Sequence, residues 1–160
     1  DGTRRISYII LTDRKVWGTN TAKALILEGK EVRDTLNVNY FVIDDCAGAP
    51  ENPNEGPYPY FSEERKSLGT IRKGQVKKIE VPLKNIGYQT LLIHKAESDS
   101  PAVSIAVPEE EIESKETVTL TITVDGALLP AGEYQSQVNV ITNSKPVPVA
   151  GLRIYGTVTD

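Results

Sequence analysis

Hydrophobic and polar positions alternate along most of the second half of this 160-residue chain. Two segments show the alternation most clearly, residues 77–84 and residues 152–158. The apolar side of the first is Ile79, Val81 and Leu83, and that of the second is Leu152, Ile154, Gly156 and Val158. A period of two indicates a strand with one face against a core, and many such strands build a sandwich.

Seven segments between residues 62 and 160 have this strand character, with turn residues between them. They are residues 67–71, 76–84, 90–96, 102–107, 116–125, 133–142 and 149–158. The count predicts an all-β fold, an immunoglobulin-like β-sandwich of about seven strands. Pro82 lies inside the second segment and indicates an edge or a bulge there. The acidic run at residues 109–111 is typical of a solvated loop.

The first part of the chain predicts a small β-rich N-terminal region over residues 1–45. Residues 3–13 and 32–44 are strand-like, and apolar residues on both sides of the second predict a strand covered on both faces. Residues 21–28 fit a short helix or one arm of a hairpin, and we favour the hairpin. Arg5-Ile6-Ser7 resembles Arg153-Ile154-Tyr155, which suggests a degenerate second module or a chance similarity.

Residues 46–61 have a different composition, with four prolines and two glycines before Tyr60. We expect this stretch to be a linker or an ordered loop that sustains neither a ladder nor a helix, ahead of the sandwich at residues 62–160.

Composition excludes several classes of function. The formal net charge is -4, and the basic residues are scattered among acidic ones, so we expect no nucleic-acid binding. No apolar stretch approaches the ~20 residues of a membrane helix. With one cysteine, Cys46, there is no internal disulfide. The chain has no methionine, so we expect it to have been trimmed before Asp1, which leaves room for a leader or a lipid anchor upstream.

One aromatic cluster lies outside the predicted strands, at Tyr58, Tyr60 and Phe61. Exposed rings of this kind stack on sugars or fill a pocket in a partner, whereas inward rings would cover the open end of the sandwich. Trp17 poses the same choice. These four residues are the candidate contacts for a protein or glycan partner.

No residue pattern predicts catalysis, a cofactor or a metal ion. His94 has no acid or thiol near it in the sequence, so we expect a packed or exposed side chain. We also expect a β-bulge beside His94, because its position does not fit the alternation set by Leu91 and Ile93. Cys46 lacks a recognisable base. Asp13, Asp44 and Asp45 match no calcium loop. The phosphate-binding, nucleophile-elbow and zinc-helix motifs are missing as well.

The strand-and-turn series resembles the bacterial domain of unknown function 1573 family, whose sandwiches are similar to the ASH and major-sperm-protein type. The resemblance covers residues 66–158. Its motifs are residues 68–71 (Leu-Gly-Thr-Ile), 84–87 (Lys-Asn-Ile-Gly), 91–93 (Leu-Leu-Ile), 130–134 (Pro-Ala-Gly-Glu-Tyr), 142–146 (Thr-Asn-Ser-Lys-Pro) and 152–158. Many members carry a Cys-Gly-Cys element where this chain has residues 98–101, Ser-Asp-Ser-Pro, so a role of that element does not transfer.

The resemblance implies an exported protein of the periplasm or cell surface, often a lipoprotein. We therefore expect a non-catalytic binding or scaffolding module of the cell envelope. Two alternatives remain open. One is an accessory domain or subunit of a hydrolase, with a site around Asp13, Asp44 and His94 as its enzymatic form. The other is a chaperone-like module that donates or accepts an edge strand.

Overall fold

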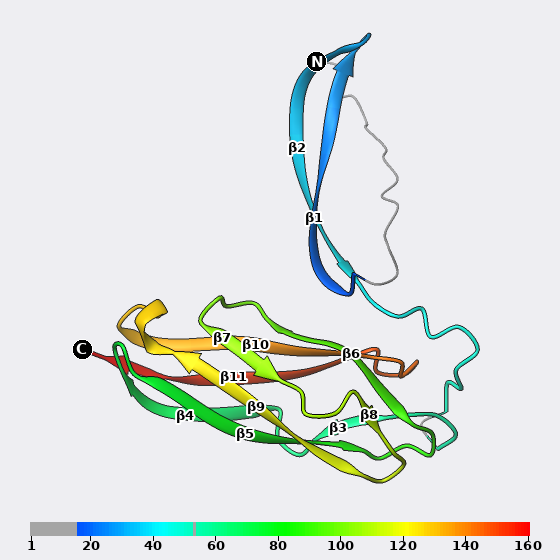
Figure 1. The fold of residues 1–160 in the computed structure, drawn as a ribbon, viewed down its shortest axis with the longest axis vertical. Coiled ribbons are helices and arrows are strands. Elements are labelled where there is room, and N and C mark those ends of the chain that lie inside the picture. Colours follow the sequence, from blue (N-terminus) through cyan, green and yellow to red (C-terminus); the bar gives the residue numbers. More distant parts are fainter. Residues whose placement is uncertain (1–15, 53) are drawn as a thin grey trace. The chain divides into compact units, whose positions relative to one another are not determined.

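The structure is a computed structural model that describes residues 16–52 and 54–160. The chain divides into two compact units, residues 1–42 and Ile43–Asp160 (Figure 1). The strand predicted over residues 3–13, its similarity to residues 153–160 and the candidate Asp13 lie outside the described residues.

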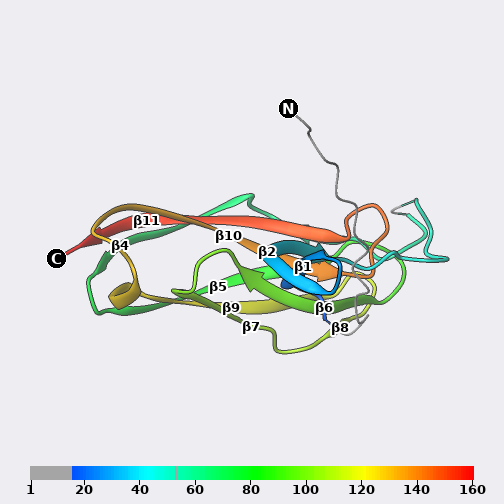
Figure 2. The same cartoon turned by 90° about the horizontal axis from the view of Figure 1, so that it is seen from above.

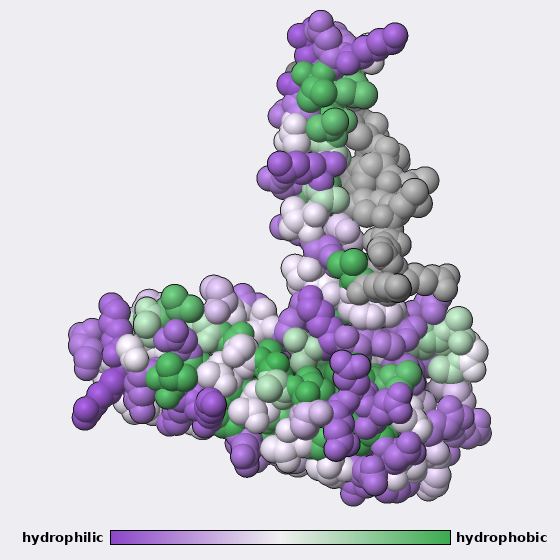
Figure 3. Space-filling model, viewed as in Figure 1, coloured by the Kyte–Doolittle hydropathy of each residue, from purple (hydrophilic) through white to green (hydrophobic). Residues whose placement is uncertain are grey.

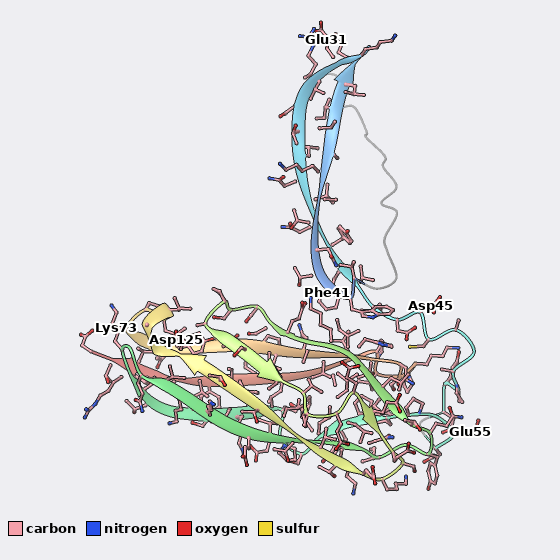
Figure 4. All side chains as sticks on the ribbon, viewed as in Figure 1. Glu31, Phe41, Asp45, Glu55, Lys73 and Asp125 are labelled. Carbon is pink, nitrogen blue, oxygen red and sulfur yellow. The ribbon has the colours of Figure 1, made fainter. Side chains whose placement is uncertain are left out.

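The described part of the first unit is a long antiparallel hairpin of β1 (Gly18–Glu28) and β2 (Glu31–Val42). The hairpin prediction for residues 21–28 is confirmed. Gly29, at a φ of 66°, and Lys30 form its two-residue turn, and Figure 4 labels Glu31 beside that turn. Glycine suits such a turn because it adopts positive φ without steric cost.

The expectation that the second hairpin strand is covered on both faces is wrong. Leu36 and Phe41, on opposite faces of β2, are 41% and 42% exposed. Apolar side chains are therefore visible along the hairpin in Figure 3. The described part of this unit is two strands alone, which offer no second layer against which β2 could bury both faces.

The second unit is a sandwich of two sheets (Figure 2). The first sheet has the order β4-β11-β10-β6-β8 and the second has the order β3-β5-β9-β7. Their bounds are β3 Pro59–Phe61, β4 Arg65–Arg72, β5 Val76–Asn85, β6 Leu91–Ser98, β7 Val103–Ala106, β8 Glu111–Ile112, β9 Thr117–Asp125, β10 Gly132–Thr142 and β11 Val149–Thr159. A 3-10 turn, η1 (Gly126–Leu128), follows β9.

The apolar and polar residues that alternate in the sequence lie on opposite faces of each sheet. All seven predicted segments are strands, and their apolar sides meet between the sheets in two clusters. The first cluster centres on Leu68, Ile71, Val81, Ile122, Leu152 and Ile154, and the second on Leu83, Leu91, Ile112, Leu120 and Val140. The fold is an all-β, immunoglobulin-like sandwich, and burial of these side chains is its main source of stability.

Two short strands depart from the predictions. The expectation that no ladder forms before residue 61 fails at β3, because Pro59 pairs with Asn85 at the edge of the sheet, where proline is tolerated. Glu111, expected in a loop, pairs with Leu92 in β8. Pro82 behaves as predicted: β3 ends opposite Leu83, so β5 has no neighbour on that side at Pro82.

Candidate functional site

The tyrosines of the predicted contact lie on the ladder between β3 and β5. Tyr60 is opposite Lys84. The ladder continues before β3, since Ile86 N–H donates to the Tyr58 carbonyl and Tyr88 N–H to that of residue 56, both at 2.9 Å. Because side chains alternate along paired strands, five residues share the outer face there. We call them the tyrosine surface: Tyr58, Tyr60, Lys84, Ile86 and Tyr88.

The tyrosine surface is open to solvent. Tyr60, Ile86 and Tyr88 are 46%, 37% and 60% exposed, and Tyr58 is half-buried. Lys115 Nζ lies 3.6 Å from the centroid of the Tyr88 ring and donates to the Ile86 carbonyl at 2.5 Å. A cation above a ring is attracted by its quadrupole, so Lys115 orients Tyr88. The result is a contiguous aromatic and apolar surface beside two lysines.

Phe61 lies on the other side of the same strand. Side chains of adjacent strand residues point to opposite faces, and Phe61 packs against both core clusters. Its ring therefore joins the interior of the sandwich, which is the packing role that the sequence left open. We leave Phe61 out of the tyrosine surface.

A fully buried asparagine, Asn85, fixes the backbone beneath the tyrosine surface. Its side-chain oxygen accepts from the N–H groups of Tyr58 and Gly87 at 3.1 and 3.0 Å. Its amide nitrogen donates to three carbonyls, those of Gln89 at 2.8 Å, Ile112 at 3.0 Å and Glu113 at 3.3 Å. One side chain thus ties two segments to the end of β5, namely the stretch before β3 and the end of β8. Buried polar groups need such partners, so this network specifies the local geometry.

Two further polar residues hold the same end of the sandwich, the end at which Figure 4 labels Glu55. Ser144 is fully buried, and its hydroxyl donates to the Pro57 carbonyl at 2.8 Å. Asn143 accepts from the Leu92 N–H at 2.8 Å and donates to the Thr90 carbonyl at 3.2 Å. Ser144 therefore anchors the proline-rich stretch before β3 from the loop between β10 and β11, and Asn143 ties the same loop to the start of β6.

Trp17, the fourth candidate contact, belongs to the first unit. It is half-buried and immediately precedes β1. Its neighbour Gly18 is buried and has a φ of 84°. Trp17 is therefore not part of the tyrosine surface, which belongs to the second unit.

His94 has an acidic partner that the sequence did not suggest. Its Nε2 lies 2.6 Å from Oδ2 of Asp44, and both side chains are about one-fifth exposed. The predicted bulge is present: the register between β6 and β10 shifts so that His94 has no paired residue between Lys95 and Ile93. The view of His94 as isolated from any acid is wrong, because the two residues are fifty positions apart and meet only in the fold.

Cys46 lies next to this pair but is poorly suited to act as a nucleophile. The thiol is buried, and its Sγ donates to the Asp44 carbonyl at 3.6 Å. Burial raises the pKa of the Cys46 thiol, the negative charges of Asp44 and Asp45 raise it further, and Lys145 lowers it. The thiolate is the reactive form, so this environment suppresses reactivity at neutral pH.

Within residues 16–52 and 54–160, no three histidine, cysteine, aspartate or glutamate side chains come together as a metal site would require. Over the same residues no helix has the length and apolar character needed to cross a membrane.

A family model described as protein of unknown function (DUF1573) matches residues 60–158. The chain belongs to this family. The match begins in β3 and ends in β11, so it takes in both sheets of the sandwich. No curated protein matches this sequence.

Solved structures share the fold. A protein of unknown function from Porphyromonas gingivalis W83 is 15% identical, with a TM-score of 0.71 over 92% of this chain and 69% of its own. The ASH/PapD-like domain of human CEP192 is 12% identical, with a TM-score of 0.55 over 76% and 95%. The Vibrio cholerae VesB protease is 14% identical, with a TM-score of 0.50 over 63% and 31%. At these identities the likeness establishes the sandwich fold and nothing about activity.

Proposed function

We propose that this DUF1573 protein is a non-catalytic binding module of the bacterial cell envelope that holds a partner protein through the tyrosine surface. The observation that carries the proposal is the contiguous exposure of Tyr60, Ile86 and Tyr88 on one sheet face. Tyrosines contribute much of the energy at protein interfaces, since the ring is apolar and the hydroxyl finds a partner at the rim.

The frame beneath these rings supports a binding role. Asn85 and Ser144 fix the backbone on which Tyr58 and Ile86 lie, so little freedom is lost when a partner docks. Lys84 within the tyrosine surface and Lys115 beside it suit a partner with acidic groups around an apolar centre. The exported members of the family favour the periplasm or the cell surface as the location.

The enzymatic alternative has less support. His94 and Asp44 are adjacent, but neither lines the hollow of about 610 Å³ on the outer face of the five-stranded sheet, and the raised pKa of Cys46 opposes nucleophilic catalysis. Strand addition would need a free edge. Within the sandwich the longest edge strand is β4, with eight residues, and its Leu68 carbonyl and Arg72 N–H are already bonded to the side chains of Lys77 and Gln75. Such bonds protect an edge against pairing.

The test compares three variants in retention of envelope proteins by the immobilised chain. We expect the double variant Tyr60→Ala/Tyr88→Ala to lose the retained proteins while its melting temperature stays within ~2 °C, because both rings are solvent-facing. Tyr155→Ala, on the opposite sheet, is the matched control and should retain them. Phe61→Ala should instead lower the melting temperature, since that ring packs in the core.

Direct binding then settles whether the retained protein is a true partner. The purified candidate should bind the wild-type chain and Tyr155→Ala equally, and the double tyrosine variant at least ~10-fold more weakly. Equal binding to all three proteins, or retention of a glycan and no protein, would refute a protein partner at this surface. A large loss of stability in the double variant would assign the tyrosines to packing.

A further inference from the structure

A second surface feature lies on the outer face of the five-stranded sheet, over β4, β11 and β10. It is a hollow of about 610 Å³. This volume lies within the roughly 300–1,000 Å³ typical of small-molecule sites. The tyrosine surface belongs to the other sheet, so the two features involve separate sets of side chains.

The hollow forms at a break in the regular register between β4 and β11. Tyr155 is opposite Ser67, but the next residue, Gly156, is opposite Gly69, so Leu68 is an extra residue in β4. Gly69 has a φ of 64°, which favours glycine. A Cβ on Gly156 would lie 2.6 Å from the Gly69 carbonyl oxygen, so both glycines are required. The bulge bends the edge strand and leaves the backbone uncovered there.

The side chains around the hollow form two rows across the three strands. In one row Gln135, Tyr155 and Ser67 are neighbours, and in the next Glu133, Thr157 and Thr70 are neighbours. Adjacent strands are about 4.8 Å apart, so each row extends roughly 10 Å. Arg65 borders the first row, and its guanidinium lies over the Tyr155 ring at 4.9 Å from the ring centroid.

These groups are chemically complementary to a sugar. Hydroxyl, amide, carboxylate and guanidinium groups can each donate to or accept from sugar hydroxyls. Tyr155 is 38% exposed with the Arg65 guanidinium over its ring, and the exposed part of the ring offers an apolar surface for the carbon-bound hydrogens of a sugar. The charged lining residues are one cation, Arg65, and one anion, Glu133, so the formal charge of the lining is zero. That balance disfavours phosphates and uronates.

We propose that the hollow over β4, β10 and β11 is a binding site for a neutral oligosaccharide. Tyr155 with Arg65 forms the stacking wall, and Gln135, Glu133 and Thr157 bind ring hydroxyls. The site is independent of the partner-protein surface described above. With a single carboxylate among the lining residues, Glu133, it holds the sugar and does not hydrolyse it, because glycoside hydrolysis uses a pair of carboxyl groups.

The experiment titrates the chain with maltotriose, cellotriose, mannotriose and chitotriose, and with digalacturonic acid as the anionic comparison, while amide shifts are followed by NMR. We expect at least one neutral sugar to bind with a Kd in the micromolar to millimolar range. Its shifts should centre on Ser67, Gln135 and Thr157. Failure of all four neutral sugars at about 10 mM, or preference for the uronate, would overturn the proposal.

Substitutions locate the binding. Tyr155→Ala and Gln135→Ala should each weaken the bound sugar about 10-fold or more, and Tyr155→Phe, which keeps the ring, should stay near the wild type. Both positions, 135 and 155, face solvent, so the fold is retained in all three variants. The control Tyr60→Ala/Tyr88→Ala should bind the sugar normally. If that control alone loses the sugar, the glycan belongs at the tyrosine surface and both proposals are wrong; if no variant weakens it, the hollow is not its site.

Discussion

Replacement of Asn85 tests whether one side chain holds the end of the sandwich that carries the tyrosine surface. Asn85→Ala removes five hydrogen bonds, two accepted from N–H groups and three donated to carbonyls. All the groups that lose a partner belong to the backbone of residues near β3, β5 and β8. We expect a marked loss of stability and a displaced Tyr58.

The magnitude follows from what is left unpaired. A buried group without its partner costs about 1–3 kcal/mol. Asn85 is fully buried, but water can enter the space left by the amide and satisfy some of the five partners. We therefore expect a total loss of about 3–5 kcal/mol, a large part of the roughly 5–15 kcal/mol by which domains are stable. The melting temperature should fall on the order of 15 °C.

Asn85→Asp sharpens the test. The aspartate keeps an acceptor for Tyr58 and Gly87 but turns a second oxygen towards the carbonyls of Ile112 and its neighbours. Repulsion between that oxygen and the carbonyls should make this conservative change at least as costly as alanine.

The assay is urea unfolding followed by far-ultraviolet circular dichroism, with Asn139→Ala as the control. Asn139 is half-buried on the outer side of β10 and should cost no more than ~0.5 kcal/mol. A loss below ~1 kcal/mol for Asn85→Ala, or an aspartate variant as stable as the wild type, would show that the network does not hold this end.

The remaining predictions concern the contact between Gly87 and the stretch before β3, and the buried thiol. Gly87→Ala should destabilise by more than ~2 kcal/mol in urea unfolding, because its Cβ would lie 2.1 Å from the carbonyl oxygen of residue 56; a neutral result would mean that this stretch moves freely. Cys46 should react with iodoacetamide much more slowly in the native chain than in urea at pH 8, since its pKa is raised and little thiolate forms; stability should fall as pH rises above the unfolded thiol pKa of about 8.5. Asp44→Asn should speed that alkylation and Lys145→Ala should slow it, because the first removes a charge that raises the pKa of Cys46 and the second a charge that lowers it; equal rates would refute the electrostatic account.

The strands were predictable because their signal is local. Ile122 and Val124, for example, alternate with polar residues and are fully buried. Such alternation identifies the buried face of a strand without knowledge of which strand pairs with it. The short strand β3 was missed for the opposite reason. Its ladder depends on Asn85 and Ser144, which act on residues 57 and 58 from far along the chain and override the effect of the prolines.

The candidate sites divide in the same way. Sequence reasoning found Tyr58 and Tyr60 as aromatic residues outside a predicted strand, but the parity that turns Phe61 inward required the register with β5. Ile86 and Tyr88 were overlooked because they join the surface through backbone bonds to the stretch before β3. The Asn-x-Gly turn at residues 85–87 was the signal that could have suggested that contact.

The motifs that place the chain in its family account for the frame of the sandwich. Asn85 and Ser144 belong to two of them and bind backbone, and Gly69 and Gly156 belong to two others and lie at one bulge, where Gly69 has a positive φ and Gly156 has no room for a Cβ. The exposed residues Tyr60 and Tyr88 lie outside these motifs. The family motifs therefore account for the backbone frame that presents the tyrosine surface, while the choice of partner depends on exposed side chains outside those motifs.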